Sequence, residues 1–188
     1  MLSLRQQWVQ AAILPPALVP CAGLELTPDG AHMIFTARMK PSAQDLKKVE
    51  GDPFVEGLWK RNVVELFLGN PITGRYLEVH LAPCFAWWSC FFSSVRQREQ
   101  PHGRPLPLAA IEHRANKGNT QWQATVRLDA AVICQMLEVM DVSGLHGNYA
   151  AVVMPASAPA AFFSYASLPG QTPDFHQPAA WLPLGTGR

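Results

Sequence analysis

Seventeen prolines in a chain of 188 residues leave few stretches in which a helix could form. Proline lacks the amide proton that an interior helical turn needs, so it interrupts helices and is common between strands. Between the prolines, apolar residues alternate with polar ones or run in short bursts that end at turn residues, as in β-strands. This pattern predicts strands at Val19–Leu26, His32–Met39, Asn62–Leu68, Arg75–Ala82, Phe85–Ser93, Ile111–Ala115, Gln121–Leu128, Tyr149–Met154 and Ala161–Ser167.

Helical segments are scarce by the same criteria. Ala130–Val139 has the pattern of a helix, Gln44–Val49 is a candidate for a short helical turn, and Gln97–Leu108 is expected to be a loop. Many short strands with almost no helix are typical of sandwiches. We therefore expect an all-β fold, a two-sheet antiparallel β-sandwich with at most one or two short helices. Because neither a repeat nor a change of composition divides the chain, residues 1–188 are expected to form a single domain.

Charge and hydropathy exclude several classes of partner. The net charge is +1 and the fifteen basic residues are scattered, so we expect no binding to nucleic acid or to an acidic membrane. The apolar stretch Ala11–Val19 is broken by Pro15 and Pro16 and lacks a cleavage site after it, so it does not fit a signal peptide. No apolar run approaches the ~20 residues that span a bilayer. These features predict a cytoplasmic protein.

The four cysteines do not predict a disulfide framework. Cys84 and Cys90 fall on or beside one expected strand, where six residues cover about 20 Å. A disulfide requires Cα atoms within about 7 Å. Cys21 and Cys134 remain, and neither belongs to a Cys-x-x-Cys pair. We expect four reduced thiols and no zinc site.

The densest part of the pattern is a hairpin between Asn62–Leu68 and Arg75–Ala82. If Leu68 lies across from Arg75, apolar residues face apolar residues along one side, which is what a buried face requires. In this register Leu66 faces Leu77 and Val64 faces Val79. The opposite side then carries Val63, Glu65, Phe67, Tyr76, Glu78 and His80.

This register places Glu65 directly across from Glu78. Two carboxylates about 5 Å apart repel each other, so the pair is destabilising unless something compensates. Arg61, Arg75, a shared proton, a cation or the hydroxyl groups of a ligand could do so. The alternative is that this face of the hairpin is simply solvated.

Aromatic residues accompany the two glutamates. Phe67, Tyr76 and one of Trp87 and Trp88 share their side of the hairpin, and Trp59 leads into the first strand. An aromatic ring that packs on the C–H face of a sugar, beside carboxylates that accept its hydroxyls, is the usual equipment of a carbohydrate site. Trp87 alternates with Ser89, whereas Trp88 shares a face with Cys90 and Phe92. We therefore favour Trp87 outside and Trp88 in the core.

Catalysis is not expected. Retaining glycosidases place two carboxyl groups roughly 5–5.5 Å apart, but direct cross-strand neighbours point the same way and cannot flank a glycosidic bond. The sequence contains no Gly-x-Ser-x-Gly, His-Glu-x-x-His, P-loop or Gly-x-Gly-x-x-Gly motif. We expect a binding protein without a cofactor.

Several short motifs resemble those of family 9 carbohydrate-binding modules and the DOMON-like superfamily that contains them, and in particular stand-alone bacterial DOMON-like proteins. Together the motifs span about two-thirds of the chain. They lie at residues 57–68 (GLWKRNVVELFL), 76–79 (YLEV), 82–88 (APCFAWW), Tyr165, 173–178 (PDFHQP) and 181–184 (WLPL).

The resemblance implies a two-sheet sandwich that binds a sugar on a concave face through stacking tryptophans and a glutamate in the strand after Leu-Trp. It points to Trp59 and Glu65, and also to Glu78. Acidic loop residues of the calcium sites in such modules have no match here, so no metal is implied. The full set of expected ligand-binding residues is Trp59, Arg61, Glu65, Tyr76, Glu78, Trp87, Trp88 and His176.

Two other functions remain open. The same superfamily includes haem-binding electron-transfer domains that use a methionine with a histidine or lysine, for which the candidates are Met33, Met39, Met154, His80 and His176. The domain could instead be a structural module whose exposed aromatic residues bind another protein. Asp174 and His176 could serve a ligand, or could fasten the C-terminal segment by hydrogen bonds.

Overall fold

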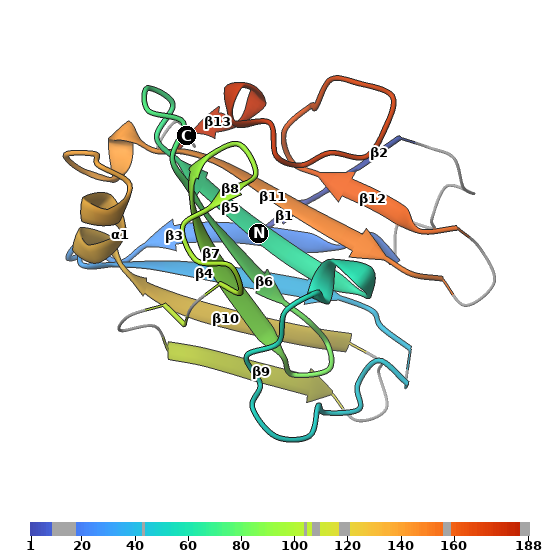
Figure 1. The fold of residues 1–188 in the computed structure, drawn as a ribbon. Helices are drawn as coiled ribbons and strands as arrows, with labels where there is room; N and C mark the ends of the chain where they lie inside the picture. Colours follow the sequence, from blue (N-terminus) through green and yellow to red (C-terminus); the bar gives the residue numbers. More distant parts are fainter. Residues whose placement is uncertain are drawn as a thin grey trace.

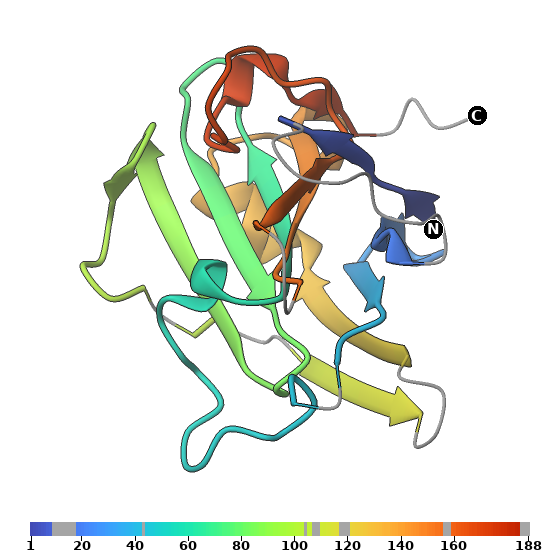
Figure 2. The same ribbon diagram turned by 90° about the vertical axis from the view of Figure 1, so that its right-hand side faces the viewer.

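The protein folds into two antiparallel β-sheets stacked face to face. The computed structural model describes residues 1–8, 18–42, 44–103, 105–106, 110–116, 121–155 and 159–184. Figure 1 shows the larger sheet crossing the smaller one, and Figure 2 shows the two sheets side by side. The expected all-β sandwich is confirmed. Between the predicted strands Ile111–Ala115 and Gln121–Leu128, which we expect to form a hairpin around Lys117–Asn119, residues 117–120 lie outside the described residues.

The smaller sheet has the strand order β1-β3-β4-β10-β9. Its strands are β1 (Leu2–Ser3), β3 (Cys21–Leu26), β4 (His32–Met39), β10 (Gln121–Asp129) and β9 (Ala110–Asn116).

The larger sheet has the order β2-β12-β11-β5-β6-β7-β8, and β13 also pairs with β11. Its strands are β2 (Arg5–Gln7), β12 (Ala161–Ser164), β11 (His146–Val153), β5 (Val63–Gly69), β6 (Tyr76–Leu81), β7 (Trp87–Ser94), β8 (Gln97–Arg98) and β13 (Leu182–Pro183). The short strands β1, β2, β8 and β13 were not predicted, since two or three residues carry no periodic pattern.

The main core lies between the sheets. In β4 and β10, alternate residues point inward and are buried, which is the period of two that a half-exposed sheet requires. From the larger sheet, β5 and β6 contribute the apolar set that the hairpin pattern predicted. The residues that these four strands contribute to the main core are Met33, Phe35, Ala37, Met39, Val64, Leu66, Leu68, Leu77, Val79, Leu81, Trp122, Ala124, Val126 and Leu128.

The larger sheet is buried on its other face as well. Every residue of β5 and β6 is buried, so neither face of this hairpin is solvated. Two segments cover the second face: residues 49–60, and the C-terminal segment 166–181, which crosses one end of the sheet in Figure 2. This cover is the reason that β5 is almost continuously apolar. The polar residues of this face therefore lie under protein.

The β5–β6 hairpin is shifted by two residues from the predicted register. Leu68 pairs with Leu77 and Glu65 pairs with His80, so Glu65 does not face Glu78. The loop begins one residue later because the Asn70 side chain accepts hydrogen bonds from the amides of Ile72 (2.8 Å) and Thr73 (3.2 Å). A shift of two keeps each side chain on its face, so the predicted faces are correct and the predicted partners are wrong.

The predicted helix is present and shorter than expected. Helix α1 (Ala130–Met136) begins where the Asp129 carboxylate accepts the amide of Val132 at 2.9 Å. It ends before Val139 because Glu138 takes a left-handed φ of 58°. Gln44–Val49 contains a turn, and single-turn 3₁₀ segments occur at Leu58–Lys60, Val142–Gly144 and Pro178–Ala180.

All four cysteines are free thiols, as expected. Cys84, Cys90 and Cys134 are buried and Cys21 is partly exposed. Across the described part of the chain, no helix has both the length and the hydropathy to cross a membrane.

His113 in β9 gives the fold a predictable acid sensitivity. Burial, aided by the charge of Lys48, lowers the pKa of His113 to about 4, and neither ring nitrogen has a hydrogen-bond partner among the residues that the structure describes. The unfolded chain therefore takes up this proton first, and stability falls as the pH drops below about 6.5. In His113→Phe, the loss of unfolding free energy between pH 7 and pH 5 should be about 1 kcal/mol smaller than in the wild type, after discounting for partial exposure. Urea unfolding at both pH values measures it, and equal losses in both proteins would contradict it.

Candidate functional site

A pocket of about 410 Å³ opens over β5, β6 and β7 on the second face of the larger sheet. The sheet supplies its floor, the Leu58–Lys60 turn and the β7–β8 hairpin supply one wall, and the C-terminal segment supplies the other. The residues that line it are Trp59, Glu65, Glu78, Phe92, Arg96, Arg98, Val152, Phe162, Pro173, Asp174, Phe175 and His176.

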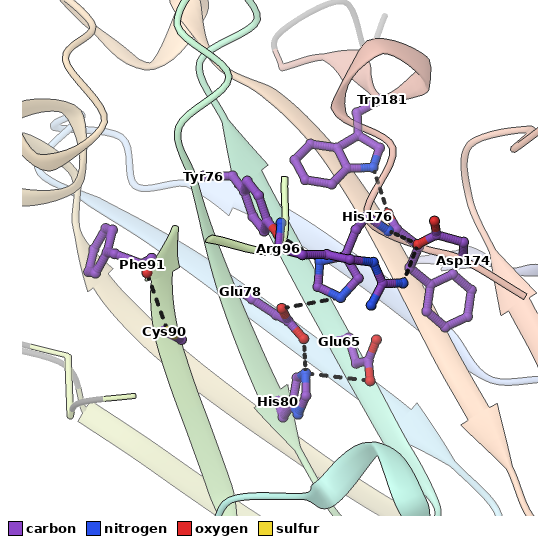
Figure 3. Close-up of polar contacts among 11 residues, drawn as sticks. Glu65, Tyr76, Glu78, His80, Cys90, Phe91, Arg96, Asp174, His176 and Trp181 are labelled. Atoms are coloured by element: carbon purple, nitrogen blue, oxygen red, sulfur yellow. Dashed lines mark hydrogen bonds and ion pairs between the residues drawn. The ribbon is translucent and has the colours of Figure 1, made fainter. Parts of the chain in front are cut away.

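Two carboxylates and one imidazole meet at the floor of this pocket (Figure 3). The Nε2 atom of His80 lies 2.5 Å from Oε1 of Glu78 and 3.5 Å from Oε1 of Glu65. Glu78 and His80 share a face of β6 because they are two residues apart, and Glu65 on β5 is the cross-strand partner of His80. Only 2% of Glu65, 5% of Glu78 and none of His80 is exposed. We call these three residues the buried cluster.

Burial and mutual charge set the ionisation of the buried cluster. Burial raises the pKa of Glu65 to about 7, with a further contribution from the Glu78 charge and opposition from His80. Burial also acts to raise the pKa of Glu78, but the charge and hydrogen bond of His80, aided by His176 and Arg98, lower it below its usual range. For His80, burial acts to lower the pKa, and the two glutamates outweigh it and raise it. His80 is thus the compensating group, rather than Arg61 or Arg75.

Glu78 keeps one oxygen without a partner. Its Oε2 atom is buried and accepts no hydrogen bond within the described residues. The nearest ring nitrogen of His176, Nε2, is 3.8 Å away, beyond hydrogen-bond distance. A buried carboxylate oxygen without a donor costs free energy, so this atom is the strongest unfilled acceptor at the floor of the pocket.

His176 is held over the pocket by Tyr76. The Tyr76 hydroxyl accepts the amide proton of Arg96 at 3.1 Å and lies 2.7 Å from Nδ1 of His176. Burial lowers the pKa of His176, so the ring is neutral at neutral pH. Since the hydroxyl already accepts one proton, we infer that it donates its own to Nδ1. The remaining ring proton then lies on Nε2, on the side of Glu78.

Charged residues form the rim. Arg96 pairs with Asp174 at 2.9 Å, and Asp174 also accepts the amide of His176 at 2.9 Å. Arg98 pairs with Glu56, and its guanidinium carbon lies 5.7 Å from the ring centre of Trp59. Trp59 is 37% exposed. The pocket therefore combines acceptors on its floor, donors on its rim and aromatic surface between them.

The structure brings together half of the residues expected from the sequence. Trp59, Glu65, Glu78 and His176 line the pocket, whereas Tyr76 lies behind it and orients His176. Arg61 is exposed, approaches the Cys84 sulfur at 4.0 Å and is not among the residues that line the pocket. Asp174 both fastens the C-terminal segment and lines the pocket, so those two expectations describe one arrangement.

The expected orientation of the two tryptophans is wrong. Trp88 pairs with His80 across β6 and β7 and lies on the pocket side of the sheet, with its ring centre 5.0 Å from that of His80. Trp87 packs on the main core and against Phe54. The physical reason is that both faces of this sheet are buried, so the polar residue Ser89 did not mark a solvent face. Trp88 is 1% exposed and packs against the rings of His80 and Trp59.

Sequence reasoning missed Phe92, Arg96, Arg98, Phe162 and Phe175 among the lining residues. Phe92 could have been found, because it alternates with Trp88 and Cys90 on one face of β7. Arg96 lies in the turn between β7 and β8, just before the segment Gln97–Leu108 that was expected to be a loop, and Arg98 lies on β8 within that segment. Phe162 and Phe175 meet the pocket through long-range packing that no local pattern indicates.

The haem hypothesis finds no matching pair. Met33 and Met39 lie in the main core between the sheets, on the opposite side of the larger sheet from His80 and His176. Met154 is partly exposed at the end of β11. His80 is occupied by the two glutamates.

One solved structure supports the fold, and the comparisons with known proteins leave the family open. No family model matches the chain, so the DOMON-like resemblance stays a prediction. The mouse UPF0462 protein C4orf33 homolog is 29% identical over 84% of this chain and 77% of its own length. Human UPF0462 protein C4orf33 is 31% identical over 67% of this chain, and the zebrafish homolog is 29% identical over 68%. The chain spans 59% of the human protein and 60% of the zebrafish protein.

A crystal structure from Bacteroides uniformis, of a protein proposed to bind carbohydrate, has a similar fold. The TM-score is 0.64 with 16% identity, over 87% of this chain and 77% of that one. The likeness shows the fold alone. The three sequence relatives are vertebrate proteins, so they do not support the bacterial group that the motifs suggested.

While both glutamates of the buried cluster are present, His80 should be essential to the stability of the fold. His80→Phe keeps a ring of similar size but leaves two buried carboxylates without a cation, which should lower the free energy of unfolding by about 3–5 kcal/mol. Urea unfolding of the variant and of the wild type at pH 7.5 measures the loss. A loss below about 1 kcal/mol would contradict the ion pairing, since that is the range of exposed pairs.

Proposed function

We propose that the protein is a non-catalytic binding protein whose pocket over β5–β7 takes a small carbohydrate. The observation that carries the proposal is the unpartnered, buried Oε2 atom of Glu78 at the pocket floor. A hydroxyl group of a sugar would donate to it, and charge-assisted hydrogen bonds of this kind are stronger than neutral ones.

The rest of the pocket fits the same ligand class. The inferred Nε2–H group of His176 and the guanidinium groups of Arg96 and Arg98 can donate to hydroxyl oxygens from the opposite side. Trp59 and Phe92 offer apolar surface for the C–H face of a sugar ring. A polyhydroxylated ring is both donor and acceptor, so it can use the floor and the rim together.

The volume of the pocket and the similarity of the fold to a solved structure also support the carbohydrate proposal. A volume of about 410 Å³ lies in the lower range of small-molecule pockets, which suits a mono- or disaccharide rather than a long chain. The Bacteroides uniformis protein with the similar fold is itself proposed to bind carbohydrate. The buried, paired state of the two glutamates favours a holding role for them over cleavage of a glycosidic bond.

Calorimetry against a panel of mono- and disaccharides tests the proposal. The wild type should bind at least one sugar at millimolar concentration or below. Glu78→Gln should weaken that binding by about 1–3 kcal/mol, which is roughly fivefold to 150-fold, because it removes the charged acceptor. Trp59→Ala should weaken it by a similar factor through the lost ring contact.

Glu112→Gln is the matched control. Glu112 is an exposed glutamate on the smaller sheet, paired with Arg114, and its substitution should leave sugar affinity unchanged. Folded wild-type protein that binds no sugar in the panel would refute the carbohydrate proposal. In that case a protein partner that meets the exposed edge of Trp59 becomes the better hypothesis.

A further inference from the structure

The buried cluster has the composition of a metal site. One imidazole nitrogen of His80 and one carboxylate oxygen each from Glu65 and Glu78 all lie within 4.8 Å of one another. The hairpin pattern already placed these three residues on one face and left a cation open as compensation for the glutamates, and the observed pairing of β5 with β6 puts Glu65 directly beside His80. The cluster uses no cysteine, so the argument against a zinc site from the thiols does not apply to it.

The distances suit coordination after a small adjustment. Zinc binds imidazole nitrogen and carboxylate oxygen at about 2.0–2.2 Å, which separates neighbouring ligand atoms of a tetrahedron by about 3.3 Å. The corresponding distances from Nε2 of His80 are 3.5 Å to Glu65 and 2.5 Å to Glu78. Of these two distances, the first already suits a tetrahedral site and the second has to lengthen by less than about 1 Å; the two carboxylate oxygens lie within 4.8 Å of each other.

Charge and hydrogen bonding point to a ligand at this spot. The two carboxyl groups can bring two negative charges to a buried place, and a divalent cation bound between them would balance both. Independently, Oε2 of Glu78 is buried without a partner and lies on the pocket side. A carboxylate oxygen in that state is available to a cation that enters through the pocket.

We propose that Glu65, Glu78 and His80 bind one divalent transition-metal ion at the floor of the pocket. The imidazole ligand favours zinc and its neighbours in the first transition row over calcium or magnesium. Three protein ligands leave an open coordination position, which faces the cavity. His176 lines the cavity and is held by Tyr76 behind it, so its inferred Nε2–H group can donate to an oxygen bound at that position.

Zinc titration of metal-free protein tests this proposal. After removal of metal with a chelator, the wild type should bind one Zn²⁺ per chain with a dissociation constant in the micromolar range or below. Glu65→Gln and Glu78→Gln should each weaken binding at least tenfold, because a neutral amide oxygen replaces a charged ligand. Glu112→Gln should bind as the wild type does. Ca²⁺ and Mg²⁺ should bind more weakly than Zn²⁺ in parallel titrations.

Two further measurements keep the test decisive. Thermal melts establish that each variant is folded, and Co²⁺ titration of the wild type should give visible absorption bands that differ from those of the aqueous ion. Three results would overturn the proposal. They are no Zn²⁺ binding to folded wild type, Zn²⁺ binding by the two glutamine variants as tight as by the wild type, and a Co²⁺ spectrum like that of the aqueous ion. The titrations contain no sugar, so their outcome is independent of the carbohydrate proposal.

Discussion

The free-energy cost of burying Glu65 and Glu78 must be offset by the groups around them, and these groups also form the pocket. Removing a carboxylate from water costs several kcal/mol, and the attraction of a partner returns that cost only when the geometry is good. Here a single imidazole serves both carboxylates, from 2.5 Å on one side and 3.5 Å on the other. The segments that cover the larger sheet exclude water from the cluster and at the same time form the walls of the pocket. One oxygen of Glu78 still lacks a donor. A fold selected for stability alone would more readily place apolar residues at these three positions.

The sequence predicted the faces of the strands better than their partners. Alternation along β5 and β6 separates Glu65, Glu78 and His80 from the core residues, and the structure confirms that division. The register depended on where the loop begins, which the hydrogen bonds of the Asn70 side chain decide. An error of two residues preserved every face and replaced a pair of repelling glutamates with a glutamate–histidine pair. The site could therefore be located from the sequence, but its electrostatics could not.

For a related reason, the burial of both faces of the larger sheet could not be predicted from the sequence. A strand covered on both sides loses the alternation that distinguishes inside from outside. The orientation of Trp87 and Trp88 was misjudged on this ground, because a solvent face was assumed where none exists. The cover itself comes from residues 49–60 and from the C-terminal segment, which reach the sheet through contacts distant in sequence. Contacts distant in sequence also bring Arg96, Arg98 and Phe175 to the pocket, and local sequence patterns do not indicate such contacts.

We propose that the buried cluster serves to bind a ligand and that the fold does not depend on it for stability. The triple variant Glu65→Met, Glu78→Met, His80→Phe tests this directly, because it replaces all three groups by apolar side chains of similar size. Urea unfolding should show a free energy of unfolding equal to that of the wild type or higher by up to about 4 kcal/mol, as for other buried ion clusters replaced in this way. Binding of Zn²⁺ and of sugar should both be lost. A triple variant that is less stable than the wild type by several kcal/mol, or that keeps its ligand affinity, would contradict the account.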